Sequence, residues 1–176
     1  MHNMTRWFEK WHKQQEKMKH ALHNTYVHRM LGERVFHHDV WVINQDSFAG
    51  GLSLGLFIAF TPTIPFHTLL CALGAILLRV NLPIAVAASW VVNPLTALPI
   101  FLSACRIGRY FFEHSAIGRF ELDLFSFESR TGKFMKASLY LWTGSLFFSI
   151  VFAFLGNAVA RLGWRIVNWY KSKREA

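Results

Sequence analysis

The chain has 176 residues, which suits one domain, and 53% of them are apolar whereas only 16% are charged. This balance is too apolar for an ordinary soluble fold of this size. Three stretches, 47–78, 80–105 and 137–160, contain no Asp, Glu, Lys or Arg, and each exceeds the ~20 residues that a helix needs to span the hydrocarbon of a membrane. The sequence therefore predicts an all-α, integral membrane protein.

The net charge of +9 could suggest nucleic acid, but the basic residues flank the apolar stretches and do not form a soluble module of their own. Lys and Arg beside a membrane gain roughly 1 kcal/mol each near anionic headgroups. We therefore expect anionic membrane lipids as partners and no nucleic acid. Cys71 and Cys105 both lie in apolar stretches, where cysteine acts as a small apolar residue, so neither a disulfide nor a metal site is expected.

The N-terminal segment, residues 1–45, is basic and amphipathic. Its Trp, Met and other apolar residues recur at helical spacing, with Lys and Arg on the same helix. Such a helix is expected to lie in the headgroup plane with its Trp-rich stripe facing the hydrocarbon; packing on a soluble neighbour is the alternative. The segment has no apolar signal-peptide core, so no cleaved leader is expected. Seven of the nine histidines lie between His2 and His38, but no carboxylate-supported pair such as HExxH accompanies them, so no metal is expected.

The first apolar run is interrupted by proline. Asp46 and Ser47 can cap a helix that starts near Phe48. A straight helix of ~30 residues would measure ~45 Å against ~30 Å of hydrocarbon, and two prolines interrupt the run within 61–65. We expect two half-helices that meet there, as a re-entrant hairpin or a sharply broken span.

The second apolar run has the same design. A turn at Arg79 and at the Asn-Leu-Pro sequence of 81–83 precedes it. Residues 85–92 are expected to form a short helix, Asn93-Pro94 to break it, and 95–110 to form another helix.

The remaining chain divides into a loop and a final helix. Residues 113–136 have a mixed composition and are expected to form an amphipathic extramembrane loop, which separates the broken runs (46–112) from the last segment (137–176). The run 137–160 lacks proline and predicts a plain spanning helix, followed by aromatic interface anchors and a basic tail. Since Lys and Arg near membrane ends stay cytoplasmic, both termini are expected in the cytoplasm. One broken run then crosses, the other is re-entrant, and the last helix returns.

Four strings of residues carry a family resemblance: FAGGLSLGLFIAFTPTIPFHTLL from 48, RVNLP from 79, SWVVNPLTALP from 89 and IGRYFF from 107. Together they resemble DUF2062, a bacterial membrane family of unknown function, over about 47–112. The resemblance implies a small multi-helix domain of the bacterial inner membrane. Members are sometimes attached to glycosyltransferase-like domains, which implies envelope polysaccharide or lipid-linked sugar chemistry and an envelope-biosynthesis enzyme as partner. His67 stands where the resemblance leads us to expect Gln in many relatives.

Both proline breaks suggest a ligand site. A helix that begins inside a membrane exposes unpaired N–H groups and a positive dipole end, which hydrocarbon penalises unless something polar occupies the site. Thr61 before Pro62 and Asn93 before Pro94 each resemble a cap followed by proline at the first helical position. Paired breaks of this kind indicate a transporter's substrate site, with helix N-termini aimed at an anion. The side chains that could add hydrogen bonds or charge are Thr63, His67, Thr68, Ser89, Thr96, Arg79, Arg106 and Arg109.

Two functions follow as hypotheses. The first is a small transporter or lipid flippase-like protein for an anionic substrate, such as a lipid phosphate of envelope biogenesis. The second is a non-catalytic scaffold or accessory subunit for an envelope enzyme such as a glycosyltransferase, in which Gly51 with Gly55 and Ala85 with Ser89 pack helices closely. No enzyme activity and no cofactor are expected, because the apolar runs hold no Asp or Glu base. Their only histidine, His67, is expected to be neutral and hydrogen-bonded to a Thr or a backbone carbonyl.

Overall fold

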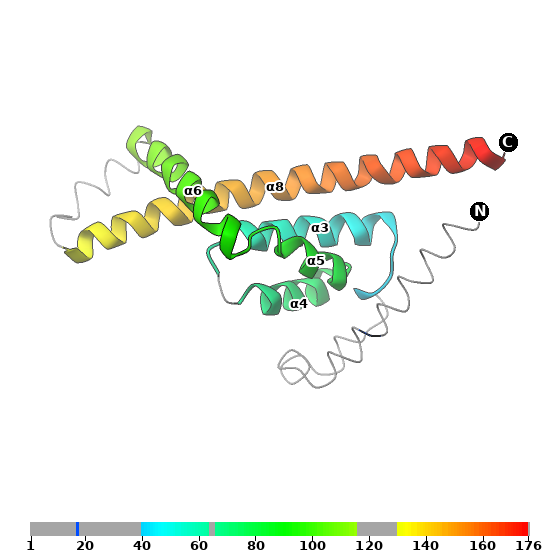
Figure 1. Cartoon of the computed structure of the whole chain (residues 1–176), viewed down its shortest axis with the longest axis horizontal. Helices are drawn as coiled ribbons and strands as arrows, with labels where there is room; N and C mark the ends of the chain where they lie inside the picture. Colours follow the sequence, from blue (N-terminus) through cyan, green and yellow to red (C-terminus); the bar gives the residue numbers. More distant parts are fainter. Residues whose placement is uncertain (1–16, 18–39, 64–65, 116–129, 176) are drawn as a thin grey trace.

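The described part of the chain is helical. The computed structural model describes residues 17, 40–63, 66–115 and 130–175, and within them all five long elements are α-helices and no strand occurs (Figure 1). The all-α prediction is confirmed. The predictions for the basic N-terminal helix and its histidines, and for the part of the loop at 116–129, lie outside the described residues.

The first helix of the broken region, α3 (Gln45–Phe60), begins three residues before the predicted start. Its cap is Asn44, whose side-chain oxygen accepts a hydrogen bond from the N–H of Ser47 at 2.7 Å, so the prediction that Asp46 and Ser47 cap the helix is wrong. Asp46 lies in the first turn, where a carboxylate is favoured by the positive helix end. Asn and Asp cap helices about equally well, so adjacent candidates could not be separated by residue type.

The chain reverses after α3, returns beside it as α4 (His67–Leu78), and reverses again into α5 (Leu82–Ser89) (Figure 1). The predicted interruption at 61–65 is confirmed. The helix predicted at 85–92 is present but lies three residues earlier, because Asn81 caps it and proline occupies its first turn.

Asn81 is a buried polar centre that joins three segments. Its Nδ2 donates to the Val42 carbonyl and its Oδ1 accepts from the Ile84 N–H, both at 3.0 Å, while its own N–H donates to the Ser47 carbonyl at 3.1 Å. Its side chain is fully buried. We name this end of the hairpin the base: α3 starts there, α4 ends there at Arg79 in left-handed backbone (φ 52°), and α5 starts there.

Glycines let α3 and α5 approach closely along the hairpin. A Cβ placed on Gly51 would lie 2.6 Å from the carbonyl oxygen of Asn81, and one on Gly55 would contact the carbonyl oxygen of Ala85 and lie 2.6 Å from the Cβ of Ala88. A close-packed interface has no room for these atoms. The predicted small-residue packing of Gly51 and Gly55 is confirmed.

The second interruption separates α5 from α6 (Pro94–His114), and the two helices are bent by 76° relative to each other. Asn93 caps α6 with proline directly after it, as predicted. The helix extends beyond the predicted 95–110, so the first residues of the loop predicted at 113–136 are helical.

The longest helix, α8 (Arg130–Glu175), has 46 residues and extends the predicted final span at both ends (Figure 1). It therefore also includes the last residues of the predicted loop. It runs antiparallel to α3. The Ser53 hydroxyl donates to the Ala153 carbonyl at 2.9 Å, and Asp46, earlier in α3, pairs with Arg161, later in α8, at 2.9 Å.

The helices α6 and α8 cross where each has a glycine. A Cβ on Gly108 would contact the carbonyl oxygen of Tyr140 and lie 2.9 Å from the backbone N of Gly144. A Cβ on Gly144 would contact the carbonyl oxygen of Ala104. The two backbones are therefore in direct contact, and only hydrogen fits at these positions.

Among the described residues, one helical stretch, Thr131–Lys173 within α8, is long and apolar enough to cross a membrane. Helices α5 and α6 meet the same criterion only together, as a pair bent by 76°. By length and composition, the described helices therefore provide one span, or two if the bent pair counts as one.

Candidate functional site

Four helix ends meet at the end of the hairpin opposite the base, and we name this region the tip. It contains the C-termini of α3 and α5 and the N-termini of α4 and α6. Val92, between α5 and α6, packs in one apolar cluster with Ala59 and Phe60 at the end of α3. The His67 ring, at the start of α4, has its Nε2 3.1 Å from the carbonyl oxygen of Thr61. The structure thus brings the two interruptions together.

Thr61 ends α3 and does not start a helix, so the predicted helix start at Thr61 and Pro62 is wrong. The Thr61 backbone is extended (ψ 138°), and its hydroxyl donates to the Phe57 carbonyl at 2.8 Å. The next helix begins at His67, and its N-cap residue Phe66 makes no side-chain cap. The chain reverses direction here, and a hairpin of two helices needs a non-helical connection before the second helix can begin.

The first turn of α4 is the open helix N-terminus of the tip. The first N–H groups of any helix lack partners inside it, and α4 has no side-chain cap, in contrast to α3, α5 and α6. Thr68 is exposed in this turn. Free N–H groups at a positive helix end suit a phosphate or a carboxylate.

His67 makes the hydrogen bond that was predicted for it. Its Nε2 must carry the hydrogen in order to donate to the Thr61 carbonyl, so in the neutral ring Nδ1 is left as an acceptor. The imidazole ties the start of α4 to the end of α3.

The N-terminus of α6 is closed by its own side chains. Asn93 Oδ1 accepts from the N–H groups of Leu95 and Thr96 at 2.9 and 3.1 Å, and the Thr96 hydroxyl accepts from the Asn93 N–H at 2.9 Å. The predicted cap at Asn93 with Pro94 at the first helical position is confirmed. Because these amides are already paired, an anion at this end would have to displace the Asn93 side chain.

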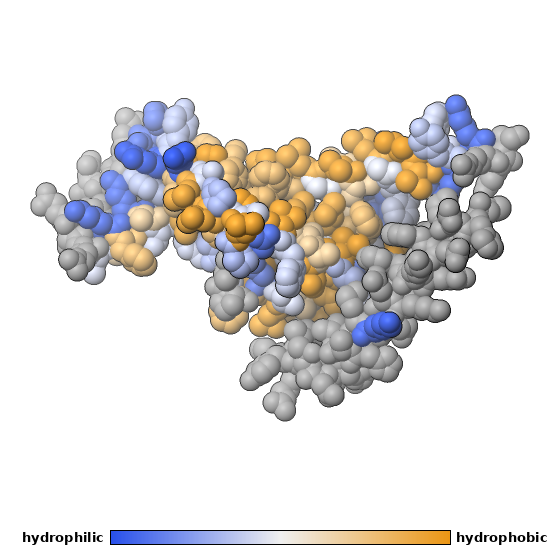
Figure 2. All heavy atoms as spheres, viewed as in Figure 1, coloured by the Kyte–Doolittle hydropathy of each residue, from blue (hydrophilic) through white to orange (hydrophobic). Residues whose placement is uncertain are grey.

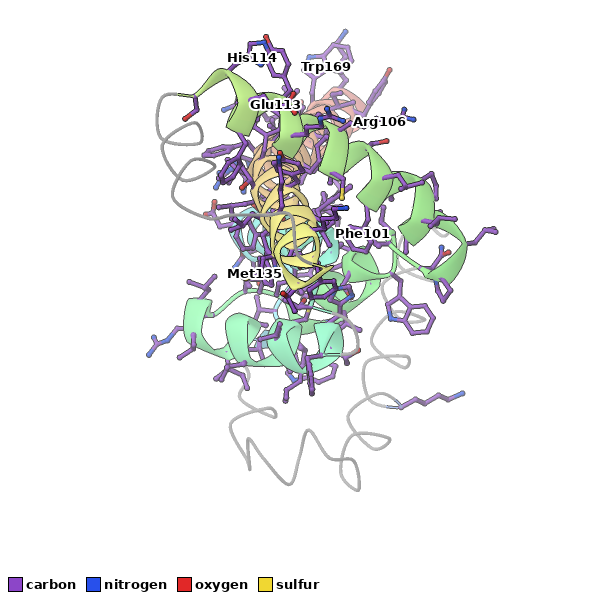
Figure 3. The ribbon with its side chains drawn as sticks, turned by 90° about the vertical axis from the view of Figure 1, so that its left-hand side faces the viewer. Phe101, Arg106, Glu113, His114, Met135 and Trp169 are labelled. Carbon is purple, nitrogen blue, oxygen red and sulfur yellow. The ribbon has the colours of Figure 1, made fainter. Side chains whose placement is uncertain are left out.

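The predicted arginines do not gather at the tip. Arg79 lies at the base, whereas Arg106 and Arg109 are exposed on α6, and Arg109 Nε donates to Glu113 at 2.7 Å. Figure 3 shows Arg106, Glu113 and His114 along α6, on the side of the bundle opposite α4. The predicted residues that do lie at the tip or beside it are Thr61, Pro62, Thr63, His67, Thr68, Ser89, Asn93, Pro94 and Thr96.

Two serines of α8 are further candidates that the sequence did not single out. Ser145 and Ser149 are fully buried, and their hydroxyls have no hydrogen-bond partner among the described residues. They share a helix face with Phe152, whose ring stacks on that of Phe60 with centroids 4.3 Å apart. Two serines spaced by four in an apolar run were a signal that could have drawn attention to them.

The described part of the site lacks the usual metal-binding clusters of His, Cys, Asp and Glu. Within the described ranges, no three His, Cys, Asp or Glu side chains are close enough together to hold a metal ion. The chemistry available at the tip is hydrogen bonding by hydroxyls, amides and one imidazole, together with four helix ends.

The fold and the tip define a helical protein with a broken-helix hairpin packed on one long apolar helix. The chain belongs to the family described as "Uncharacterized protein conserved in bacteria (DUF2062)", which matches residues 28–174. The resemblance noted in the four strings is therefore confirmed, and the match extends past 47–112 in both directions. No curated protein and no solved structure matches the chain.

Proposed function

We propose that this chain is a multi-pass protein of the bacterial inner membrane in which α8 crosses the bilayer. Only 28% of the most apolar window of α8 is buried inside the protein, and Phe154 and Val159 on it are 74% and 63% exposed. Figure 2 shows mostly hydrophobic side chains over the middle of the described surface, with hydrophilic ones gathered toward both ends of α8. A hydrophobic band between polar ends suits a protein surrounded by lipid.

The hairpin in this proposal is re-entrant. At ~1.5 Å per residue, the 16 residues of α3 measure ~24 Å and the 12 of α4 ~18 Å, both less than the ~30 Å of hydrocarbon. Phe60 at the tip stacks on Phe152, which lies close to the middle of the charge-free run 137–160. The tip would then lie near the bilayer centre, with the base near one interface beside Arg161 and Trp164.

The remaining helices then complete the crossing. The bent pair α5 and α6 would cross from the base side to the opposite face, and α8 would return, which puts both termini in the cytoplasm. Reporter fusions after Tyr170 should be cytoplasmic, and fusions at position 126 should be periplasmic. Cytoplasmic signals from both fusions would refute this crossing scheme.

We propose that the tip handles an anionic substrate, in the manner of a small transporter or flippase-like protein, with the phosphate of a membrane lipid of envelope biogenesis as the substrate class. One observation supports this most directly: α4 begins at the tip with no side-chain cap, beside the ends of α3 and α5. Open helix N-termini at membrane depth are typical of substrate sites in transporters. Hydrocarbon alone would leave these amides unpaired.

The second function is a non-catalytic scaffold for an envelope enzyme such as a glycosyltransferase. Two observations favour it: the capping box that already satisfies α6, and the glycine contacts that pack α3 on α5 and α6 on α8 without a gap. In this case the breaks are rigid packing features, and the tip should be dry.

Accessibility of the open turn distinguishes the two. We suggest Thr68→Cys in a background with Cys71→Ser and Cys105→Ser, reconstituted in nanodiscs and treated with a small water-soluble thiol reagent. A substrate site should react, because ligand and water must reach it. Nanodiscs with phosphatidylglycerol should protect the thiol more than nanodiscs of phosphatidylcholine, since only the anionic headgroup is attracted to the helix N-terminus.

The control is Ser172→Cys in the same background, on the exposed tail of α8. The reaction rate of Ser172→Cys should differ between phosphatidylglycerol and phosphatidylcholine nanodiscs only through the general effect of surface charge. The difference should therefore be smaller than for Thr68→Cys. If Thr68→Cys does not react in folded protein whereas Ser172→Cys does, the tip is dry and the scaffold function takes precedence.

A further inference from the structure

Five buried hydroxyl groups have no hydrogen-bond partner among the described residues, and three of them belong to the tip or to the part of α8 beside it; the other two are those of Ser47 and Tyr140. Those of Ser145 and Ser149 belong to side chains with 0% exposure, and the Thr63 oxygen is also buried and unpaired among the described residues. A buried hydroxyl without a hydrogen bond is destabilising, because it has lost its contacts with water and gained none in the protein. Such groups in one region indicate a polar occupant.

The two serines lie on the side of α8 that packs on α3, Ser149 at the level where α3 ends and Ser145 one turn further on. Seen along α8, they lie on the same side as Phe152 and Gly156, which contact α3 at Phe60 and Leu56. Ser149 is three residues before Phe152, which is ~4.5 Å along the axis. Because α8 runs antiparallel to α3, a step toward the N-terminus of α8 is a step toward the C-terminus of α3. Ser149 is therefore level with the C-terminus of α3.

The end of α3 provides oxygen atoms of the opposite polarity to the open turn of α4. The last four carbonyls of a helix have no partner inside it and carry a partial negative charge. In α3, Thr61 satisfies two of them, by its hydroxyl to Phe57 and by its N–H to Ile58 at 3.2 Å. The described residues provide no such cap for the carbonyls of Ala59 and Phe60.

We propose that the hydroxyls of Ser145, Ser149 and Thr63, with the carbonyls of Ala59 and Phe60 at the C-terminus of α3, bind a small monovalent cation, for which Na⁺ is the probe. Hydroxyl and carbonyl oxygens replace the hydration shell of such ions. Each unpaired hydroxyl gains a partner, and the negative helix end gains a positive charge.

The ligand set also determines the class of ion. The tip contributes no carboxylate among its described residues, whereas Ca²⁺ and Mg²⁺ sites in proteins are built around carboxylates or phosphates. A neutral set of oxygens is suited to a single positive charge bound reversibly.

This inference deepens the proposed function, because helix C-termini and unwound carbonyls at broken helices coordinate the coupling cation in many transporters. The anion would bind at the start of α4 and the cation at the end of α3, so the two sites are neighbours of opposite charge. Their tests are nevertheless separate: the cation is measured in a neutral detergent without anionic lipid.

The test is thermal unfolding of the full chain, followed by intrinsic Trp fluorescence, in NaCl or choline chloride at equal ionic strength, together with equilibrium binding of radioactive Na⁺. We expect Na⁺ to raise the unfolding temperature in a concentration-dependent manner and choline not to. Ser145→Ala and Ser149→Ala, singly, should each weaken Na⁺ binding about tenfold, as expected for one lost contact to a charged group. The double variant should lose the Na⁺ effect.

The matched control is Ser103→Ala, which removes an exposed hydroxyl that already donates to the Pro99 carbonyl at 2.8 Å. It should keep the full Na⁺ response.

Equal stabilisation of the wild type by Na⁺ and choline, or unchanged Na⁺ binding in the single serine variants, would overturn the proposal. In that case a trapped water would satisfy the hydroxyls. If the double variant fails to fold, the single variants and the binding measurement decide. Absence of a Na⁺ effect in the wild type, with lipid protection of Thr68→Cys intact, would refute the cation site alone.

Discussion

The close contact of α6 with α8 predicts that one methyl group added at the crossing destabilises the protein. In Gly144→Ala, the new Cβ would contact the carbonyl oxygen of Ala104 and lie 2.6 Å from its carbonyl carbon and 2.9 Å from the N of Gly108. All three atoms are backbone, so no side chain can rotate away. The helices must separate, and overpacking of this kind costs about 1–3 kcal/mol.

The matched control is Gly163→Ala in the same helix, where an added Cβ meets nothing within 4 Å. Both substitutions gain about 0.5–1 kcal/mol, because Ala is a better helix former than Gly. This gain cancels in the comparison. The free energy of unfolding of the two variants should therefore differ by about 1–3 kcal/mol, with Gly163→Ala at or above the wild type.

The assay is reversible unfolding in mixed micelles by titration with a denaturing detergent, followed by circular dichroism. Gly144→Ala should also weaken the protection of α6 against proteolysis, because its packing on α8 is disturbed. If Gly144→Ala and Gly163→Ala unfold at the same point, the two backbones are not in contact and the described crossing is wrong.

Two further predictions concern buried side chains. Asn81→Ala should lower the free energy of unfolding by about 2–3 kcal/mol, because it removes a helix cap and leaves the part-buried Val42 carbonyl without its partner; Asn44→Ala, which removes only an exposed cap, should cost about 1 kcal/mol, and equal losses would contradict the role of Asn81 as a buried centre. Cys105 should react with a membrane-permeant maleimide in folded protein while Cys71, which is fully buried, reacts only after unfolding; equal rates in the folded state would count against the packing of α4 on α5.

The sequence predicts the helices and their breaks well, because proline and charge act locally. Proline cannot continue a helix interior, and charged residues mark where apolar runs end. The interruptions at 61–65 and Asn93, the cap of α6 and the close approach at Gly51 and Gly55 all follow from such local rules. The start of α3 was misplaced by three residues only because several good capping residues stand side by side.

The two breaks look alike in sequence but differ in structure. At Asn93 the chain bends by 76° and can cap the next helix at once. At Thr61 it reverses completely: the Thr61 backbone is extended, and the next helix starts only at His67. Whether a chain bends or reverses depends on which distant helix covers each face, and a single local motif does not contain that information.

The buried serines show the same limit. A serine in an apolar helix can bond to the carbonyl four residues earlier, so Ser145 and Ser149 carry no special meaning on their own. Their significance depends on α3 covering that face of α8, a contact between residues a hundred positions apart, such as Ser53 and Ala153.

That separation along the chain has a consequence for how the protein is made. Ser53 meets Ala153, and Asn157 donates to the Ala49 carbonyl at 3.4 Å, across 100 and 108 residues. At about 5–20 residues per second, the ribosome needs about 5–20 s after the synthesis of α3 to make the part of α8 that packs on it. During this interval the α8-facing side of the hairpin is uncovered. In the membrane arrangement proposed above, the protein therefore depends on its last helix to complete insertion, and nascent chains halted before α8 should be held by the insertion machinery or degraded.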